Sequence, residues 1–179
     1  VARGGGGHAG TAVAGDAGVR VSGGAGRAVK IWRRGASDGD ARDAPGRVGR
    51  CLTLVSTLER HADYVTRLAA PTDASCGSTF LSAGLGADQV FLWDASRSAA
   101  KDGSDRKADA PVARFAGQTD SAYALAADAT CAVLVTGDVK GVVRRWDARA
   151  PRERPSLLKG HAGTVRCASM DPTGRLCLT

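Results

Sequence analysis

A hairpin pattern that occurs three times along the chain constrains the fold more than any other feature of the sequence. In each copy, two apolar runs are separated by a short turn of small or polar residues, and the second run ends in tryptophan. Apolar and polar residues alternate toward that tryptophan, which is the period-two pattern of a half-buried β-strand. Two strands joined by a tight turn form a β-hairpin. The three predicted hairpins cover residues 19–32, 79–93 and 132–146.

Further apolar runs lie before and after these hairpins, so that each unit has four predicted strands. One run precedes the second and third hairpins, at 61–70 and 118–127, and another follows each hairpin, at 51–58, 111–115 and 155–160. A fourth unit begins near residue 160 and is reached by the last residues of the sequence. Units repeated in this way indicate a repeat architecture. The strands that we expect within the units lie near 65–70, 79–84, 89–93, 122–127, 132–136, 142–146 and 165–170.

Two polar stretches lengthen the units. The tryptophans are 61 and 53 residues apart, whereas repeats of four short strands take about 40–45 residues. The excess lies near 33–50 and 95–110, where the composition favours surface loops over packed structure. Residues 1–17 contain a run of glycines and are expected to be a poorly defined segment without a strand. The sequence starts without methionine and ends inside a predicted strand, so we expect it to be a partial sequence.

Composition limits the classes of function. The net charge is +7, from 25 basic and 18 acidic residues, but the arginines are scattered, and only eight residues are aromatic. This pattern does not predict a nucleic-acid ligand. No apolar run reaches the roughly 18 residues of a membrane span, and no signal peptide is evident, so no membrane is expected as a partner. The five cysteines form no CxxC pair, which favours a reduced intracellular compartment, cytoplasmic or nuclear, and no metal site.

A histidine ahead of the first strand and Trp-Asp at the end of the third resemble the signature of the WD-repeat family. The resemblance implies an all-β fold, a partial WD-repeat β-propeller of about three blades plus the start of a fourth, over residues 18–179. In this family a histidine, a serine or threonine, an aspartate in a turn and the tryptophan form a buried hydrogen-bonded chain. The matching structural residues are Ser22 and Trp32 in the first unit, His61, Ser82, Asp88, Trp93 and Asp94 in the second, Thr136, Trp146 and Asp147 in the third, and His161 in the fourth.

The units depart from the family pattern at several positions. The turn of the second unit is one residue longer than usual, which affects Asp88. In the third unit Gln118 replaces the histidine and Lys140 occupies the turn position, while Thr179 is the hydroxyl residue of the fourth. His8 stands too close to Trp32 for a full first strand and hairpin to fit between them.

Catalytic interpretations are weaker than structural ones. His161 and Cys167 could form a nucleophile pair, but the histidine already fits the hydrogen-bonded chain and a cysteine on a predicted strand is more often a packing residue. The glycine runs are not followed by the residues of a phosphate-binding loop. We therefore expect no enzyme activity, no cofactor and no small-molecule substrate.

Five segments narrow the resemblance further, in this order: STLERHADYV (56–65), SAGLGADQVFLWD (82–94), DSAYALA (120–126), VVRRWDAR (142–149) and LKGHAGTVR (158–166). They are similar to the WD-repeat activating subunits of ubiquitin-specific proteases. The resemblance implies a non-catalytic scaffold that binds such a protease and activates it allosterically, with Arg166, where the family has lysine, in contact with it. The alternative is a WD-repeat scaffold for another assembly, such as one in chromatin or RNA processing.

Overall fold

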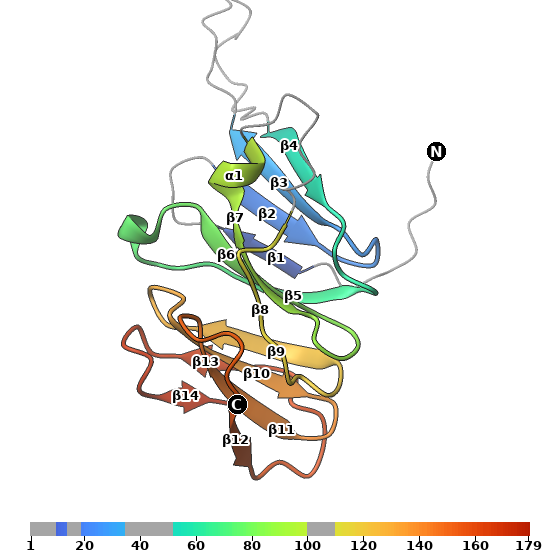
Figure 1. Cartoon of the computed structure of the whole chain (residues 1–179), viewed down its shortest axis with the longest axis vertical. Coiled ribbons are helices and arrows are strands. Elements are labelled where there is room, and N and C mark those ends of the chain that lie inside the picture. Colours follow the sequence, from blue (N-terminus) through green and yellow to red (C-terminus); the bar gives the residue numbers. More distant parts are fainter. Residues whose placement is uncertain (1–9, 14–18, 35–51, 100–109) are drawn as a thin grey trace, which may run out of the picture.

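The computed structural model describes residues 10–13, 19–34, 52–99 and 110–179 of the chain. Within these residues the fold is all-β, as the sequence predicts: three four-stranded antiparallel sheets are followed by a two-stranded one. The helical segments of this described part are a 3₁₀ turn, η1 (Ala74–Cys76), and a short helix, α1 (Ala95–Ala99). None of its helices is long and apolar enough to cross a bilayer. Figure 1 shows the sheets following one another in chain order along the long axis.

Each four-stranded sheet is a meander in which successive strands pair antiparallel. The first contains β1 (Gly10–Val13), β2 (Val19–Gly23), β3 (Val29–Arg34) and β4 (Leu52–Leu58). The second contains β5 (Val65–Ala69), β6 (Thr79–Gly84), β7 (Val90–Asp94) and β8 (Ala113–Arg114). The third contains β9 (Ala122–Ala127), β10 (Val133–Asp138), β11 (Val142–Asp147) and β12 (Ser156–Lys159). The last two strands are β13 (Ser169–Met170) and β14 (Cys177–Leu178).

The three predicted hairpins are confirmed as β2–β3, β6–β7 and β10–β11. Their turns use residues that accept a positive φ: Gly141 closes the third turn at φ +82°, where the carbonyl oxygen of His161 lies against its Cα. A side chain at this position would be strained by the backbone and would meet that oxygen, so glycine is the residue that fits.

Apolar residues fill the spaces between neighbouring sheets. The first core joins Val21 and Ile31 of the first sheet to Phe80 and Trp93 of the second. The second core joins Leu81 and Val90 to Phe115, Leu134 and Trp146, and a smaller third core includes Val135, Val143 and Val165. Consecutive residues Phe80 and Leu81 therefore serve opposite cores. The second and third sheets are buried on both faces because adjacent side chains of a strand point to opposite sides.

The first strands of neighbouring sheets are in contact with one another. β5 contacts both β1 and β9, and β13 contacts β9. Figure 1 shows β5 and β9 next to each other in the middle of the molecule. The sheets are thus joined mainly through their first strands and the cores between them.

Two expectations about strands are wrong. Residues 10–13, within the segment 1–17 that was expected to lack a strand, form β1 and pair with β2. The strand expected at 165–170 contains only Ser169 and Met170, because the register that pairs Ser169 with Leu178 would pair residues before Ala168 with positions beyond Thr179. Of the two expected loops, residues 33–34 belong to β3 and 95–99 to α1; residues 35–50 and 100–109 lie outside the described residues.

Candidate functional site

The same side-chain hydrogen bond occurs in all three four-stranded sheets. Each tryptophan donates its indole N–H to a hydroxyl on the preceding strand, and the pairs are Trp32–Ser22 (2.9 Å), Trp93–Ser82 (2.7 Å) and Trp146–Thr136 (3.0 Å). The hydroxyl residue is always paired across the hairpin with the residue two positions before the tryptophan. The structure therefore brings these six residues, all predicted from the sequence, together as three equivalent hydrogen-bonded pairs.

In the second sheet His61 extends this bond into a chain of three residues. Its Nε2 lies 2.7 Å from the Ser82 hydroxyl, which also accepts from Trp93. Its ring packs edge-on against Phe91, with the centroids 4.7 Å apart. Burial lowers the pKa of His61 to about 4, so the imidazole is neutral at neutral pH. A neutral imidazole can accept a hydrogen bond from the Ser82 hydroxyl while the Ser82 oxygen accepts one from the indole N–H of Trp93.

The third and fourth units form the corresponding bonds with other residues. Gln118, which is buried, accepts from the Thr136 hydroxyl at 2.8 Å through its Oε1 atom. The glutamine thus takes the place of His61. His161 lies 2.8 Å from the Thr179 hydroxyl, but this pair is exposed. His8 lies outside the described residues.

The acidic position of the family pattern is occupied differently from what the sequence suggests. Asp88 does not join the His61 chain: its Oδ1 accepts the Gly117 N–H at 2.7 Å. The neighbouring Gln89 faces the histidine segment instead, and its Oε1 accepts the Ala62 N–H at 2.9 Å. The extra residue in this turn moves the aspartate, at φ +55°, toward the following sheet.

Asp138 is the main polar residue that the sequence analysis missed. Its Oδ1 accepts the backbone N–H groups of Lys140 and Val142, both at 2.9 Å, and its Oδ2 pairs with Arg144 at 2.5 Å. Asp138 and Arg144 are both buried. The Asp-x-x-Gly sequence from Asp138 to Gly141, in which aspartate opens a turn, was a usable signal.

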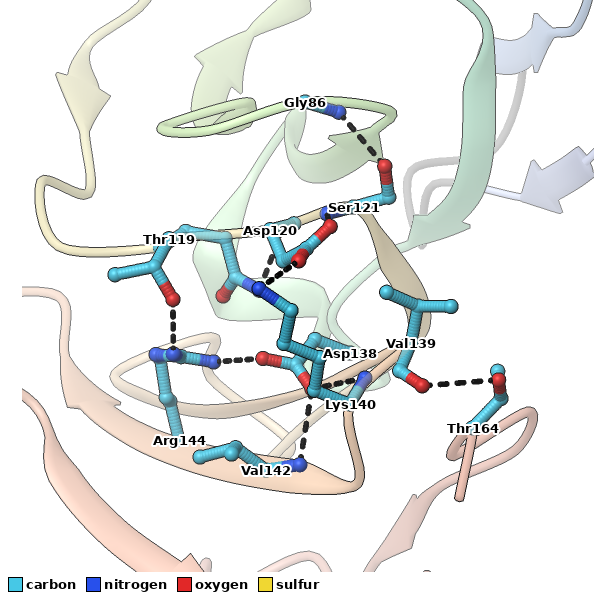
Figure 2. A network of polar contacts seen from close by, with 11 residues as sticks. Gly86, Thr119, Asp120, Ser121, Asp138, Val139, Lys140, Val142, Arg144 and Thr164 are labelled. Atoms are coloured by element: carbon cyan, nitrogen blue, oxygen red, sulfur yellow. Dashed lines mark hydrogen bonds and ion pairs between the residues drawn. The ribbon is translucent and has the colours of Figure 1, made fainter.

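The β10–β11 turn is the centre of a network that joins three sheets, shown in Figure 2. Arg144 donates to the Thr119 hydroxyl at 2.7 Å, and Lys140 pairs with Asp120 at 2.9 Å. Lys140 is exposed, and its hydrogen bond to Asp120 lowers the pKa of that carboxyl. From the adjoining units, Gly86 donates to the Ser121 hydroxyl, and the Thr164 hydroxyl donates to the Val139 carbonyl.

The aspartates that follow the tryptophans have local roles. Asp94 accepts from the backbone N–H of Ser96, in the first turn of α1, and from the hydroxyl of Ser78, both at 2.9 Å. Partial burial acts to raise the pKa of Asp94, but hydrogen bonds from Ser96 and Ser78 outweigh it and lower the pKa. Asp147 pairs with Arg149, and these hydrogen bonds lower its pKa to about 2.

Arg166 lines a groove together with Leu85 of the β6–β7 turn and Val139 of the β10–β11 turn. The groove has a volume of about 570 Å³ and is bounded by β5, β9 and residues 164–166. The Arg166 side chain is exposed, and its carbonyl accepts from the Arg67 guanidinium at 2.9 Å. The structure thus places Arg166 at a surface hollow, apart from the buried tryptophan bonds.

The cysteines do not form a site in the described part of the chain, where no group of three His, Cys, Asp or Glu side chains gathers to hold a metal. Cys131 is a buried packing residue, and burial raises its pKa to about 12. Cys167 is exposed and Cys177 is half-buried. The packing role expected for Cys167 is therefore wrong, because residues 165–168 are not covered by a paired strand. His161, the other half of the nucleophile pair considered above, contacts Thr179.

The described residues form an all-β fold in which each of the three four-stranded sheets contains a tryptophan–hydroxyl hydrogen bond at the same hairpin position. No protein-family model matches the chain.

Proposed function

We propose that the chain is part of a WD-repeat β-propeller and serves as a non-catalytic scaffold that binds a ubiquitin-specific protease and activates it allosterically. The observation that carries the proposal is the tryptophan–hydroxyl bond repeated at the same hairpin position in three consecutive sheets. A bond that recurs in this way favours copies of one structural unit over unrelated sheets.

The packing of the sheets supports the propeller part of the proposal. Each four-stranded meander has its first strand beside that of its neighbour, and the second and third sheets are buried on both faces. Blades of a propeller are four-stranded sheets arranged radially around a central channel. On this proposal β1, β5 and β9 are the inner strands of three blades, and β13–β14 begins a fourth.

The scaffold part of the proposal rests on the contacts of the polar residues that match the family pattern. His61, Ser82 and Gln118 are engaged in internal hydrogen bonds between elements, which is a structural use of such groups. Their role is to hold a rigid surface, and rigid scaffolds suit protein binding because little order is lost on association.

The choice of partner rests on the resemblance, in the order of the sequence motifs, to the WD-repeat activating subunits of ubiquitin-specific proteases, such as WD repeat-containing protein 48. Activation by a scaffold requires tighter binding to the competent conformation of the protease than to the idle one. Arg166 is the residue that we assign to this contact, because it is exposed and corresponds to a basic position of the family.

The test is the Arg166→Glu variant, with Arg152→Glu as the matched control on an exposed arginine in the turn between β11 and β12. Arg166→Glu is expected to weaken binding of the protease and its activation in parallel, because it removes one partner of a charge pair and adds repulsion. Such a change costs about 2–5 kcal/mol when the pair is desolvated. Pull-down and ubiquitin-cleavage assays measure both effects, and circular dichroism checks the fold.

Two results would contradict the proposal at different levels. Unchanged affinity and activation in Arg166→Glu would leave this residue outside the interface. Failure of the unmodified protein to activate any ubiquitin-specific protease would reject the partner and leave the propeller scaffold alone.

A further inference from the structure

The groove beside Arg166 has the dimensions of a binding site. Its volume, about 570 Å³, lies within the roughly 300–1,000 Å³ of ligand pockets. Its walls come from four successive units: Ala25 from the β2–β3 turn, Arg67 from β5, Tyr123 and Val139 from β9 and the β10–β11 turn, and Arg166 from the segment before β13. It is built from residues distant in sequence, so its shape depends on the packing of the sheets.

The charged groups of the groove are of one sign. Among the described residues that line it, Arg67 and Arg166 are the charged ones and none is acidic. Arg67 donates to the carbonyls of Thr66 and Arg166, both at 2.9 Å, which fixes its guanidinium and leaves further donors of its fork available. Two cationic side chains that line one groove, with no acidic residue in its lining, favour an acidic ligand.

Three carboxylates close in sequence to residues that line the groove are already engaged. Asp120 pairs with the exposed Lys140, and Asp138 pairs with the buried Arg144. Asp63 accepts the backbone N–H of Tyr64. None of the ion pairs found among the described residues joins an acid to Arg67 or Arg166. The positive charge of the groove is therefore not balanced from within this part of the chain.

The groove also presents apolar and aromatic surface. Tyr64 is 49% exposed and Val139 38% exposed, and Tyr123 and Leu85 complete this wall. The wall is fixed by the network of Figure 2, in which the Val139 carbonyl accepts from Thr164. Exposed tyrosine on a rigid frame is typical of protein-binding surfaces.

We infer that this groove binds an extended acidic segment of a protein, with carboxylates on Arg67 and Arg166 and an apolar side chain against Tyr64 and Val139. Two cations beside an apolar wall favour a peptide over a nucleic acid, whose backbone requires a row of cations. The inference rests on the proposed scaffold function, for which it names the kind of partner segment.

The experiment measures fluorescence anisotropy of a labelled peptide in which glutamate and leucine alternate, titrated with the full chain. The lysine–leucine counterpart and a labelled single-stranded oligonucleotide are the comparison probes. We expect binding of the acidic peptide alone, weakening as salt is raised. Arg67→Ala combined with Arg166→Ala should weaken it at least tenfold. Arg152→Ala, which removes one positive charge outside the groove, should not weaken it and is the matched control for Arg166→Ala alone. Tyr64→Ala should weaken it without a change in its salt dependence.

Because Arg67 also holds two carbonyls, Arg166→Ala is measured alone as a variant that leaves those bonds intact. No binding of the acidic peptide, equal binding of the lysine peptide or the oligonucleotide, or equal losses in the groove variants and Arg152→Ala would overturn the inference. Protease activation without peptide binding would reject the groove and leave the proposed function. Peptide binding without protease activation would reject the proposed function and leave the groove as a binding site.

Discussion

At the scale of single residues, Trp93 and Trp32 make the same hydrogen bond at different depths. Trp93 is 1% exposed and packs against Phe80 and Phe91, whereas Trp32 is half-buried. We predict that Trp93→Ala lowers the free energy of unfolding by about 3–5 kcal/mol, as for other buried aromatic side chains. Trp32→Ala should lower it by less, since part of its surface is already in contact with water. Urea denaturation of both variants measures the difference, and equal losses would contradict it.

His61 gives the chain a pH dependence whose direction follows from its burial. Its pKa is about 4 in the folded chain and about 6.5 when exposed, so the unfolded chain takes up the proton first as the pH falls. The stability contributed by neutral His61 is therefore complete above pH 6.5 and is lost as the pH falls toward 4. With 1.36 kcal/mol per pKa unit, the loss is roughly 3 kcal/mol.

The variant that tests this prediction is His61→Gln, because Gln118 makes the corresponding bond to Thr136 in the third sheet. The variant should keep the contact with Ser82 and remove the titration. We expect the difference in unfolding free energy between the two proteins to shift between pH 6.5 and 4 in favour of the variant. Both proteins contain the same carboxylates, so the pH dependence that these groups contribute cancels in the difference. A difference independent of pH would show that His61 does not titrate on unfolding.

Residues of the repeated bond were predictable from the alternation of apolar and polar residues along the strands, whereas the contacts of the turn residues were not. Ser82 and Trp93 stand at fixed positions on paired strands, so the register of the hairpin places them together. Asp88 and Asp138 lie where the chain reverses, and one extra residue changes which side chain faces inward. Turn length decides this, and strand periodicity carries no information about it.

At the scale of elements, the contact between consecutive sheets depends on matched side-chain sizes. A Cβ on Gly23 would lie 2.7 Å from Val65, and one on Gly137 would lie 2.5 Å from Val165. At the equivalent place between the second and third sheets, Ala83 and Ala122 share one buried cluster. Where one sheet contributes valine to this contact, its neighbour has glycine, and where one contributes alanine, its neighbour also has alanine.

We predict that Gly137→Ala destabilises the chain by about 1–3 kcal/mol, the usual effect of overpacking. Val165→Ala alone leaves a cavity, and the double variant, which copies the pair Ala83 and Ala122, should lose less than the two single losses together. Unfolding free energies of the three variants give this coupling. Strict additivity would mean that the two positions do not compete for the same space.

The strand boundaries show where the local sequence pattern is sufficient to predict a strand. Hairpins β6–β7 and β10–β11 form where alternation predicts them, because both partners are adjacent in the chain. β1 lies in a glycine-containing stretch without a clear pattern, and its pairing with β2 supplies the hydrogen bonds that local propensity does not. The segment 165–168 has the pattern of a strand but no paired strand beside it.

At the scale of the whole molecule, stability comes from cores shared between units. Each core takes side chains from two neighbouring sheets, so a sheet contributes to the burial of the next one. The sequence could predict this arrangement because repeated amphipathic units cannot bury their faces alone. It could not predict the groove, which is formed by residues of several units and depends on how the sheets are set against one another.

Because sheets bury their apolar faces against neighbouring sheets, apolar side chains remain exposed on and beside β12 and β14, which are edge strands of their sheets. Leu176 is 73% and Leu178 78% exposed around β14, and Leu157 and Leu158 are exposed on β12. Contiguous exposed leucines beside unpaired strand edges favour association between copies. We predict that the 179-residue chain self-associates as its concentration rises, and that Leu176→Ser with Leu178→Ser reduces this.

Sedimentation velocity over a concentration series measures the effect, and Val112→Ser is the control, because Val112 is an exposed apolar side chain away from these strands. We expect the control to associate like the unmodified chain and the double leucine variant to remain monomeric to higher concentration. A monomeric unmodified chain at all concentrations, or equal behaviour of control and double variant, would contradict the prediction. The leucines would then be ordinary exposed residues, and the edge at β14 would be protected by its short length alone.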